Sequence, residues 1–231
     1  GECAPLHDLS CDYDEHYEQR LRKVCAEVEE TQNLDVRKLR HLPSMLFGLQ
    51  SAFRSAAGSL GGDYLRLYPS AFTRGEKGIP INGLVWMGSY DEMCQRMEDK
   101  LEQGFRCVKL KIGAIDFESE MELIRQLRSR YSKEVVELRV DANGGFTPSE
   151  APRKLDILAQ YDIHSIEQPI KQGQWKEMAH LCANTPLPIA LDEELIGVND
   201  FEQKIDLLDT IRHWPRTVTL AIGQPQLLKA T

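Results

Sequence analysis

Long apolar runs, an excess of positive charge and closely paired cysteines are all missing from this sequence. It contains no stretch of about 18 apolar residues, so we expect no transmembrane helix and no membrane partner. Aspartate and glutamate outnumber lysine and arginine by 36 to 28. The resulting net charge of −8 argues against nucleic acid as a partner. The remaining expectation is a protein that works on small molecules.

Cysteines are present, but they are scattered and form no Cys-x-x-Cys pair. The six are Cys3, Cys11, Cys25, Cys94, Cys107 and Cys182. In a chain of 231 residues this pattern favours reduced thiols over a disulfide framework or a zinc site. The first residues show no charged segment followed by an apolar one, so we expect no secretory signal. We therefore expect a cytoplasmic location.

Two helices without intervening strands are predicted in the first third of the chain. Residues 14–30 place apolar side chains at helical spacing, and Pro43 opens a second helix that ends near Leu60, before Gly61-Gly62. This pattern does not match the alternation that follows. We interpret 1–75 as the helical part of an α+β capping domain.

From residue 76 onward, strands alternate with helices. The expected strands are 83–88, 105–113, 136–141, 163–167 and 188–192, and the expected helices are 90–103, 116–131, 148–160 and 172–184. This alternation predicts an α/β fold, a (β/α) TIM-type barrel over 76–231. The barrel is incomplete or atypical, because only five units can be counted. A helical pattern at 205–211 and the segment 213–231 do not continue the rhythm.

The strand from Phe105 to Gly113 carries two lysines on one face. Lys109 and Lys111 alternate with Val108, Leu110 and Ile112, which is the period of a strand. Taken alone, the pattern also fits an edge strand whose lysines point to solvent.

Three later strands each end in a carboxylate, at Asp141, Glu167 and Asp192. The steps from Lys111 are 141 − 111 = 30, 167 − 141 = 26 and 192 − 167 = 25 residues. Each step is about the length of one β/α unit. The four side chains therefore occupy equivalent positions at the rim where the C-terminal ends of barrel strands meet, which is the catalytic face of such barrels.

Carboxylates that meet at one rim repel each other, and a divalent cation removes that repulsion. Oxygen ligands of this kind suit Mg²⁺. A neighbouring lysine can act as a base that removes a proton alpha to a carboxylate of a small-molecule substrate. Singly, each acidic residue also has a structural interpretation: Asp141 as a turn residue, Glu167 as a strand end, and Asp192 as part of an acidic first helical turn.

Four short motifs resemble the enolase superfamily, in its muconate-lactonizing branch. They are Val-Lys-Leu-Lys-Ile-Gly, Arg-Val-Asp-Ala-Asn-Gly, Ile-Glu-Gln-Pro and Leu-Asp-Glu-Glu. Two further stretches, Gly-Glu-Cys-Ala-Pro-Leu and Ile-Asn-Gly-Leu-Val-Trp-Met-Gly, are more similar to the o-succinylbenzoate synthases than to other members of the branch. The resemblance covers residues 1 to about 212. It implies a magnesium-dependent lyase of menaquinone biosynthesis.

The resemblance also implies roles for particular residues. Lys111 becomes the acid/base lysine and Lys109 its electrostatic neighbour. The implied Mg²⁺ ligands are Asp141, Glu167 and Asp192, with Asn143 and Glu193 close to them. The family has a second catalytic lysine on its sixth barrel strand, which we do not find: Lys204 lies in a helical pattern and Lys229 in the final segment.

Three functions stay open at this point. The first is dehydration to o-succinylbenzoate. The second is another reaction of the branch: epimerisation or racemisation of dipeptides or N-acylamino acids, or cycloisomerisation. The third is a truncated metal-binding product without turnover. An aldolase that forms a Schiff base on Lys111 is a weaker alternative, because it leaves the three carboxylates unexplained. Oligomeric state is not predicted.

Overall fold

The computed structural model describes residues 1–7, 10–60, 70–198 and 201–210. The chain forms two compact units. One consists of Gly1–Pro80 and Ile196–Gln203, and the other of Ile81–Leu195 with Lys204 and the described residues that follow it. The domain boundary that we place between residues 75 and 76 stays a prediction.

The second unit is built on a parallel sheet of five strands. They are β1 (Gly83–Val85), β2 (Cys107–Lys111), β3 (Glu137–Asp141), β4 (Ile163–Glu167) and β5 (Ile189–Ala190). Each strand pairs with the next along the chain, as successive β/α units require. The register sets Lys111 opposite Asp141 and Asp141 opposite Glu167. The predicted parallel α/β architecture is confirmed.

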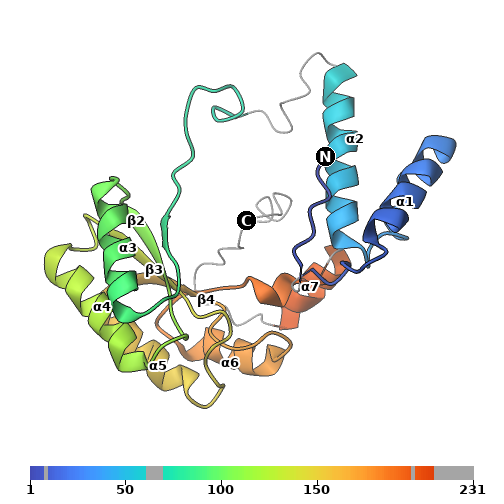
Figure 1. Cartoon of the computed structure of the whole chain (residues 1–231). Helices are drawn as coiled ribbons and strands as arrows, with labels where there is room; N and C mark the ends of the chain where they lie inside the picture. Colours follow the sequence, from blue (N-terminus) through green and yellow to red (C-terminus); the bar gives the residue numbers. More distant parts are fainter. Residues whose placement is uncertain (8–9, 61–69, 199–200, 211–231) are drawn as a thin grey trace. The chain divides into compact units, whose positions relative to one another are not determined.

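Four helices follow the first four strands and lie on the outer side of the sheet (Figure 1). They are α3 (Tyr90–Glu102), α4 (Phe117–Arg130), α5 (Ala151–Leu158) and α6 (Trp175–Asn184). Apolar side chains fill the layer between helices and strands, and the fully buried ones include Leu110, Leu123, Leu138, Leu155 and Ile166. This core holds the strands rigidly and so fixes the directions of the side chains at their ends.

Two helix starts follow directly from the local sequence. Ser89 and Glu92 form a capping box: the Ser89 N–H donates to Glu92 Oε2 at 2.8 Å, and the Glu92 N–H donates to Ser89 Oγ at 3.4 Å. Asp116 caps the next helix by accepting the N–H groups of Glu118 and Ser119, both at 3.1 Å. Both predicted starts are confirmed.

The first strand is shorter than predicted. We expected a strand over 83–88, but β1 ends at Val85. The next two carbonyl groups, of Trp86 and Met87, accept hydrogen bonds from Arg96 Nη1 at 3.0 and 2.7 Å. These contacts bend the chain out of the sheet and toward α3.

Later boundaries also differ. The helix predicted over 172–184 begins only at Trp175. The helix predicted from residue 148 begins at Ala151, because the three preceding residues form a turn in which the Glu150 N–H donates to the Thr147 carbonyl oxygen. The strand predicted over 188–192 contains only Ile189 and Ala190, and η2, a 3₁₀ turn, follows at Glu193–Leu195.

The first unit contains the two predicted consecutive helices, α1 (Tyr17–Thr31) and α2 (Pro43–Leu60). Ser44 joins them, because its hydroxyl group lies 2.6 Å from the Tyr17 hydroxyl and donates to Asp12 Oδ2 at 2.6 Å. The predicted helical pattern near residue 205 is α7 (Phe201–Thr210). The segment 213–231, with Lys229, lies outside the described residues.

Within the described part of the chain, no helix is both long and apolar enough to cross a membrane. All six cysteines carry free thiols.

Candidate active site

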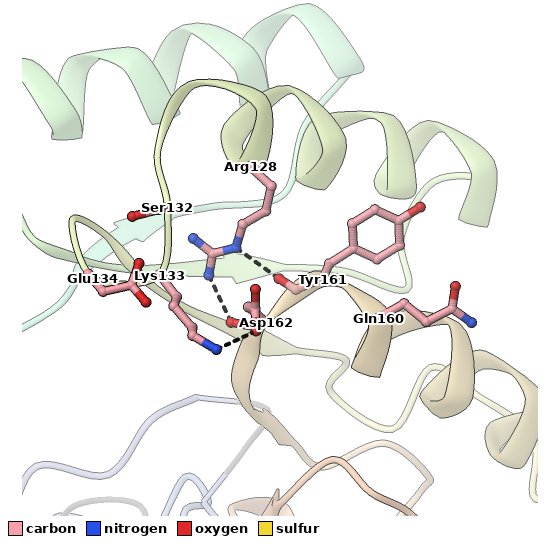
Figure 2. A pocket seen from close by; sticks show the side chains of 7 residues that line it. All are labelled: Arg128, Ser132, Lys133, Glu134, Gln160, Tyr161 and Asp162. Carbon is pink, nitrogen blue, oxygen red and sulfur yellow. Dashed lines mark hydrogen bonds and ion pairs between the residues drawn. The ribbon is translucent and has the colours of Figure 1, made fainter.

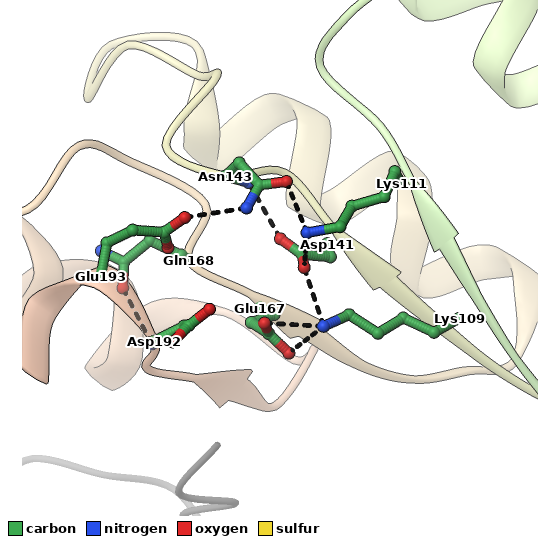
Figure 3. A network of polar contacts seen from close by, with 8 residues as sticks. All are labelled: Lys109, Lys111, Asp141, Asn143, Glu167, Gln168, Asp192 and Glu193. Carbon is green, nitrogen blue, oxygen red and sulfur yellow. Dashed lines mark hydrogen bonds and ion pairs between the residues drawn. The ribbon is translucent and has the colours of Figure 1, made fainter. Parts of the chain in front are cut away.

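The two lysines of β2 and the acidic residues of the later strands meet at the C-terminal ends of the strands (Figure 3). Both ammonium groups reach the same carboxylate, on Asp141, so the predicted shared face is confirmed. The alternative of a solvated edge strand is wrong, because β2 lies between β1 and β3 and Lys111 is only 7% exposed.

Lys111 is held by two oxygen atoms and one aromatic ring. Its Nζ donates to Asp141 Oδ2 at 2.6 Å and to Asn143 Oδ1 at 2.8 Å. The Trp86 ring centroid lies 5.3 Å from the same nitrogen, within the range of a cation–π contact. Asn143 also donates its amide to Glu193 Oε1 at 2.8 Å, which links the ends of β3 and β5.

Lys109 lies between two carboxylates. Its Nζ is 2.8 Å from Asp141 Oδ2 and donates to both carboxylate oxygens of Glu167 at 2.7 Å. Burial lowers the pKa of Lys109, but the hydrogen bonds that Lys109 donates to Asp141 and Glu167 outweigh burial and leave the pKa above its usual value. In this arrangement Lys109 is a fixed positive charge.

The two carboxylates beside Lys109 differ in their acidity. Burial raises the pKa of Asp141, but hydrogen bonds from Lys109 and Lys111 outweigh it and hold the pKa below its usual value. For Glu167, burial raises the pKa to about 7, with Lys109 opposing the shift and Asp141 adding to it. Asp141 is therefore the charged member of the pair, and Glu167 holds its proton until close to neutral pH.

Carboxyl groups outnumber lysines at the site. Two ammonium groups face four carboxyl side chains, which gives an excess of 4 − 2 = 2 negative charges once Glu167 has lost its proton, on the residues Lys109, Lys111, Asp141, Glu167, Asp192 and Glu193. One oxygen, Glu193 Oε2, is buried without a hydrogen-bond partner among the described residues. Carboxylate oxygens with two uncompensated negative charges fit a divalent cation such as Mg²⁺.

The three predicted ligands are not brought together into a ready ligand set. Among the residues that the structure describes, no three histidine, cysteine, aspartate or glutamate side chains form a group that could hold a metal ion. Asp141 and Glu167 are joined through Lys109, and Asp192 stands on the loop after β5. The assignment of Asp141, Glu167 and Asp192 as ligands stays a prediction.

Sequence reasoning missed two residues of this site. Trp86 was placed within the first strand, although the turn after β1 carries it to Lys111. Gln168 was seen only as part of the Ile-Glu-Gln-Pro motif, yet its side chain is fully buried beside the site. A polar residue directly after a rim carboxylate and before a proline was the available signal.

Residues 92–208, which are 117 of the 231 residues, match the family model described as enolase C-terminal domain-like. The chain belongs to this family. The fold of this enolase-like chain is accordingly part of a (β/α) TIM-type barrel, as the solved structures below also show.

One sequence relative and two solved structures show which members of the family the chain resembles. The o-succinylbenzoate synthase of Desulfotalea psychrophila is 50% identical over 186 residues, which are 80% of this chain and 48% of that protein. The crystal structure of MenC from Desulfotalea psychrophila LSv54 has a TM-score of 0.64 and 39% identity, over 91% of this chain and 66% of the other. The enolase-like chain thus spans about half the length of the first relative.

The third is the crystal structure of o-succinylbenzoate synthase from Thermosynechococcus elongatus BP-1, complexed with Mg in the active site. Its TM-score is 0.68 at 21% identity, over 94% of this chain and 61% of that one. At this identity the likeness shows the fold.

Proposed function

We propose that the full-length protein containing this chain is a magnesium-dependent o-succinylbenzoate synthase. Such an enzyme is a carbon–oxygen lyase: it removes a proton alpha to a carboxylate and eliminates water from a cyclohexadiene carboxylate, a step of menaquinone biosynthesis. The observation that carries the proposal is the 50% identity over 186 residues with the Desulfotalea psychrophila enzyme. The lysine–carboxylate cluster at the strand ends supplies the groups that this reaction needs.

The proposed ligands of Mg²⁺ are Asp141, Glu167 and Asp192. Support comes from their place at the ends of successive strands, from their oxygen donors and from the excess of two negative charges at the site. When bound, the cation supplies a positive charge that stabilises the negative charge developing on the substrate carboxylate. The chain's own part is to hold Asp141 and Glu167 at the ends of β3 and β4, and Asp192 on the loop after β5.

The proposed acid/base is Lys111. In its neutral form Nζ takes the alpha proton, and the resulting ammonium group then gives that proton to the departing hydroxyl group, which leaves as water. One group can serve both steps when proton and hydroxyl leave from the same face, because a base that has taken a proton is the acid the second step requires. Asp141 and Asn143 orient Nζ, and the Trp86 ring borders it.

Lys109 has a different proposed role. It contacts Asp141 and both oxygens of Glu167, so it holds two proposed ligands in place and contributes a positive charge. The second catalytic lysine of the family is not assigned. Lys204 lies in α7 and not on a strand.

The domain organisation and location complete the proposal. Residues 1–75 belong to a capping domain and residues 76–231 to the barrel domain. A cytoplasmic location is supported by the six free thiols, which persist in a reducing compartment.

The direct test is an ultraviolet assay for the aromatic product, run with full-length protein and Mg²⁺. A panel of dipeptides and N-acylamino acids is assayed alongside, because related enzymes share the proton-removal step. Product formation that is lost in Lys111→Ala supports the proposal, with Lys133→Ala as a control at an exposed lysine. Epimerisation of the panel without aromatic product moves the assignment to that class. If the protein binds the metal but turns over none of these substrates, it is inactive.

A further inference from the structure

Gln168 is a polar side chain that the site chemistry leaves unexplained. It directly follows Glu167 and is 0% exposed. Its carbonyl oxygen accepts the N–H groups of Asp192 at 3.2 Å and Glu194 at 3.1 Å. Its NH₂ group donates to the Ile170 carbonyl oxygen at 3.0 Å and to Glu194 Oε2 at 3.1 Å. The amide thus uses its whole hydrogen-bonding capacity: two lone pairs and two N–H groups.

The backbone of Gln168 connects the same strand ends. Its N–H donates to the Ala190 carbonyl oxygen at 2.9 Å, and its carbonyl oxygen accepts the Gly144 N–H at 2.7 Å. Its φ of 38° lies in the left-handed region, as does the φ of 45° at Asn143. A residue before proline is disfavoured in helical conformations, so surrounding contacts must hold this one. Strain of this kind is concentrated at functional sites.

Glu194 completes the arrangement. It is 3% exposed, and its Oε1 accepts the Gly173 N–H at 2.7 Å while its Oε2 accepts the Gln168 amide. The pair therefore ties the loop after β4 to the turn after β5. Figure 3 shows Gln168 beside Glu193 and the backbone of Asp192.

The segment that Gln168 holds is the least supported part of the site. Strand β5 has only two residues, so Asp192 and Glu193 lie beyond the sheet ladder. The flanking N–H groups of Asp192 and Glu194 both donate to one amide oxygen, which fixes the segment between them. Without that oxygen, the described backbone bond of the Leu195 N–H to the Asp192 carbonyl acts only within the turn. The side chains of Glu193 and Glu194 still accept hydrogen bonds from Asn143 and Gly173, but neither bond holds the Asp192 backbone directly.

We propose that Gln168 is a positioning residue whose amide holds the loop after β5, and so sets the place of Asp192 relative to Glu167 for cation binding. This inference rests on the proposed function. It predicts that changes at Gln168 weaken Mg²⁺ binding even though the side chain contributes no ligand. Losses of about 10- to 100-fold are typical when a residue that orients a metal ligand is changed.

The first experiment uses Gln168→Glu and Gln168→Met in the full-length protein. Gln168→Glu places a buried carboxylate at position 168 against the buried carboxylate of Glu194. Gln168→Met removes all four side-chain hydrogen bonds at similar volume. Calorimetric titration with Mg²⁺ is expected to show about 10-fold or greater weakening in both variants. Gln174→Glu is the matched control, because Gln174 lies on the following loop and donates only to the Lys171 carbonyl oxygen in its described contacts. It should bind as the wild type does.

The second experiment exchanges the partners. In Gln168→Glu combined with Glu194→Gln, the new amide at 194 can accept the Gly173 N–H and donate to the new carboxylate at 168. Only the bond to the Ile170 carbonyl oxygen is lost. We expect the double variant to recover at least half of the lost affinity on a logarithmic scale. If Gln168 only stabilised the fold, Mg²⁺ affinity would recover no further than the free energy of unfolding does. Unfolding of each variant is therefore measured in parallel, in the presence of a chelator.

A third readout needs no metal. Amide hydrogen exchange at Asp192 and Glu194 in the metal-free protein should speed up in Gln168→Met and stay unchanged in Gln174→Glu. Unchanged exchange in Gln168→Met overturns the positioning role. Wild-type affinity in both Gln168 variants also overturns it, even if their stability falls. If the wild type itself binds no Mg²⁺, the proposed function fails, and the exchange rates alone decide the role of Gln168.

Discussion

The two ends of the parallel strands both carry charged side chains, but they use them differently. At the C-terminal ends, Lys111 and Asp141 are 7% and 0% exposed and bond to each other across strands. At the N-terminal ends, Lys133 and Asp162 pair at 2.9 Å with both side chains more than half exposed. Burying charges is costly, whereas exposed pairs cost and contribute little. The buried set is therefore the one that a function has to justify.

The N-terminal ends hold a pocket that could be mistaken for a second site (Figure 2). It is lined by Arg128, Ser132, Lys133, Glu134, Gln160, Tyr161 and Asp162. The Arg128 guanidinium donates to four main-chain carbonyl oxygens: Tyr161 at 2.8 Å, Val136 at 2.8 Å, Asp162 at 2.9 Å and Tyr131 at 3.5 Å. Its donors are committed to the loops before β3 and β4, which is a structural task.

Charge balance separates the two ends as well. In the pocket at the N-terminal strand ends, two cationic residues, Arg128 and Lys133, match two anionic ones, Glu134 and Asp162. At the rim, two lysines face four carboxylates. A balanced set needs no further ion, whereas the excess of carboxylates at the rim supports the proposed divalent cation.

The largest effect is expected for Lys111→Ala in the full-length protein. Turnover should fall by about 10³-fold, within the range for loss of a general acid–base group, while Mg²⁺ affinity changes little. Steady-state kinetics and calorimetric titration measure the two quantities. If Lys109→Ala abolishes turnover and Lys111→Ala retains most of it, the two roles are reversed.

Cys107 tests whether the other end of strand β2 is chemically inert. Burial raises the pKa of its thiol to about 11, with Glu137 adding to the shift and Arg139 opposing it. The difference from an ordinary value of 9 predicts alkylation about 100-fold slower near neutral pH, because the thiolate reacts. Iodoacetamide labelling followed by mass spectrometry from pH 7 to 10 measures the rate. A plateau near pH 9 would contradict the burial argument.

The same shift has a consequence for stability. The folded thiol of Cys107 holds its proton to higher pH than the unfolded thiol does. Its contribution to the free energy of unfolding is therefore complete below pH 9 and is lost as the pH rises toward 11.

Arg128→Met tests the structural role of the pocket at the N-terminal strand ends. Four carbonyl oxygens lose a charged donor, so the free energy of unfolding should fall by about 1–3 kcal/mol. Urea denaturation measures the loss. The turnover number per folded molecule should stay at the wild-type value, and a fall in turnover without a loss of stability would assign this pocket to the chemistry.

The smallest effect is expected for Lys133→Ala. Its ion pair with Asp162 is exposed, so removal should change the free energy of unfolding by less than about 1 kcal/mol. The same denaturation experiment at low and high salt measures it. A larger, salt-insensitive loss would show that this end also depends on buried charge.

Much of the fold and the position of the site could be predicted because both depend on local pattern. Alternation within 105–113 defines β2, and Ser89 and Asp116 mark helix starts. A spacing of about one β/α unit places Lys111 and Asp141 in register. Each of these features depends on a few neighbouring residues or on the period of one β/α unit.

The remaining features depend on where side chains and turns go. The placement of Lys109 between two carboxylates requires the actual register of three strands. The approach of Trp86 to Lys111 depends on Arg96 capturing the chain after β1. The role of Gln168 depends on its left-handed φ, which no periodicity encodes.

The measurement that tests the central claim most directly is calorimetric titration of Mg²⁺ into the full-length wild type, Asp141→Asn and Arg128→Met. If the unbalanced carboxylates at the rim hold the cation, the wild type and Arg128→Met bind with similar affinity, and Asp141→Asn loses the site or binds far more weakly. Equal affinity in Asp141→Asn and the wild type would contradict the account.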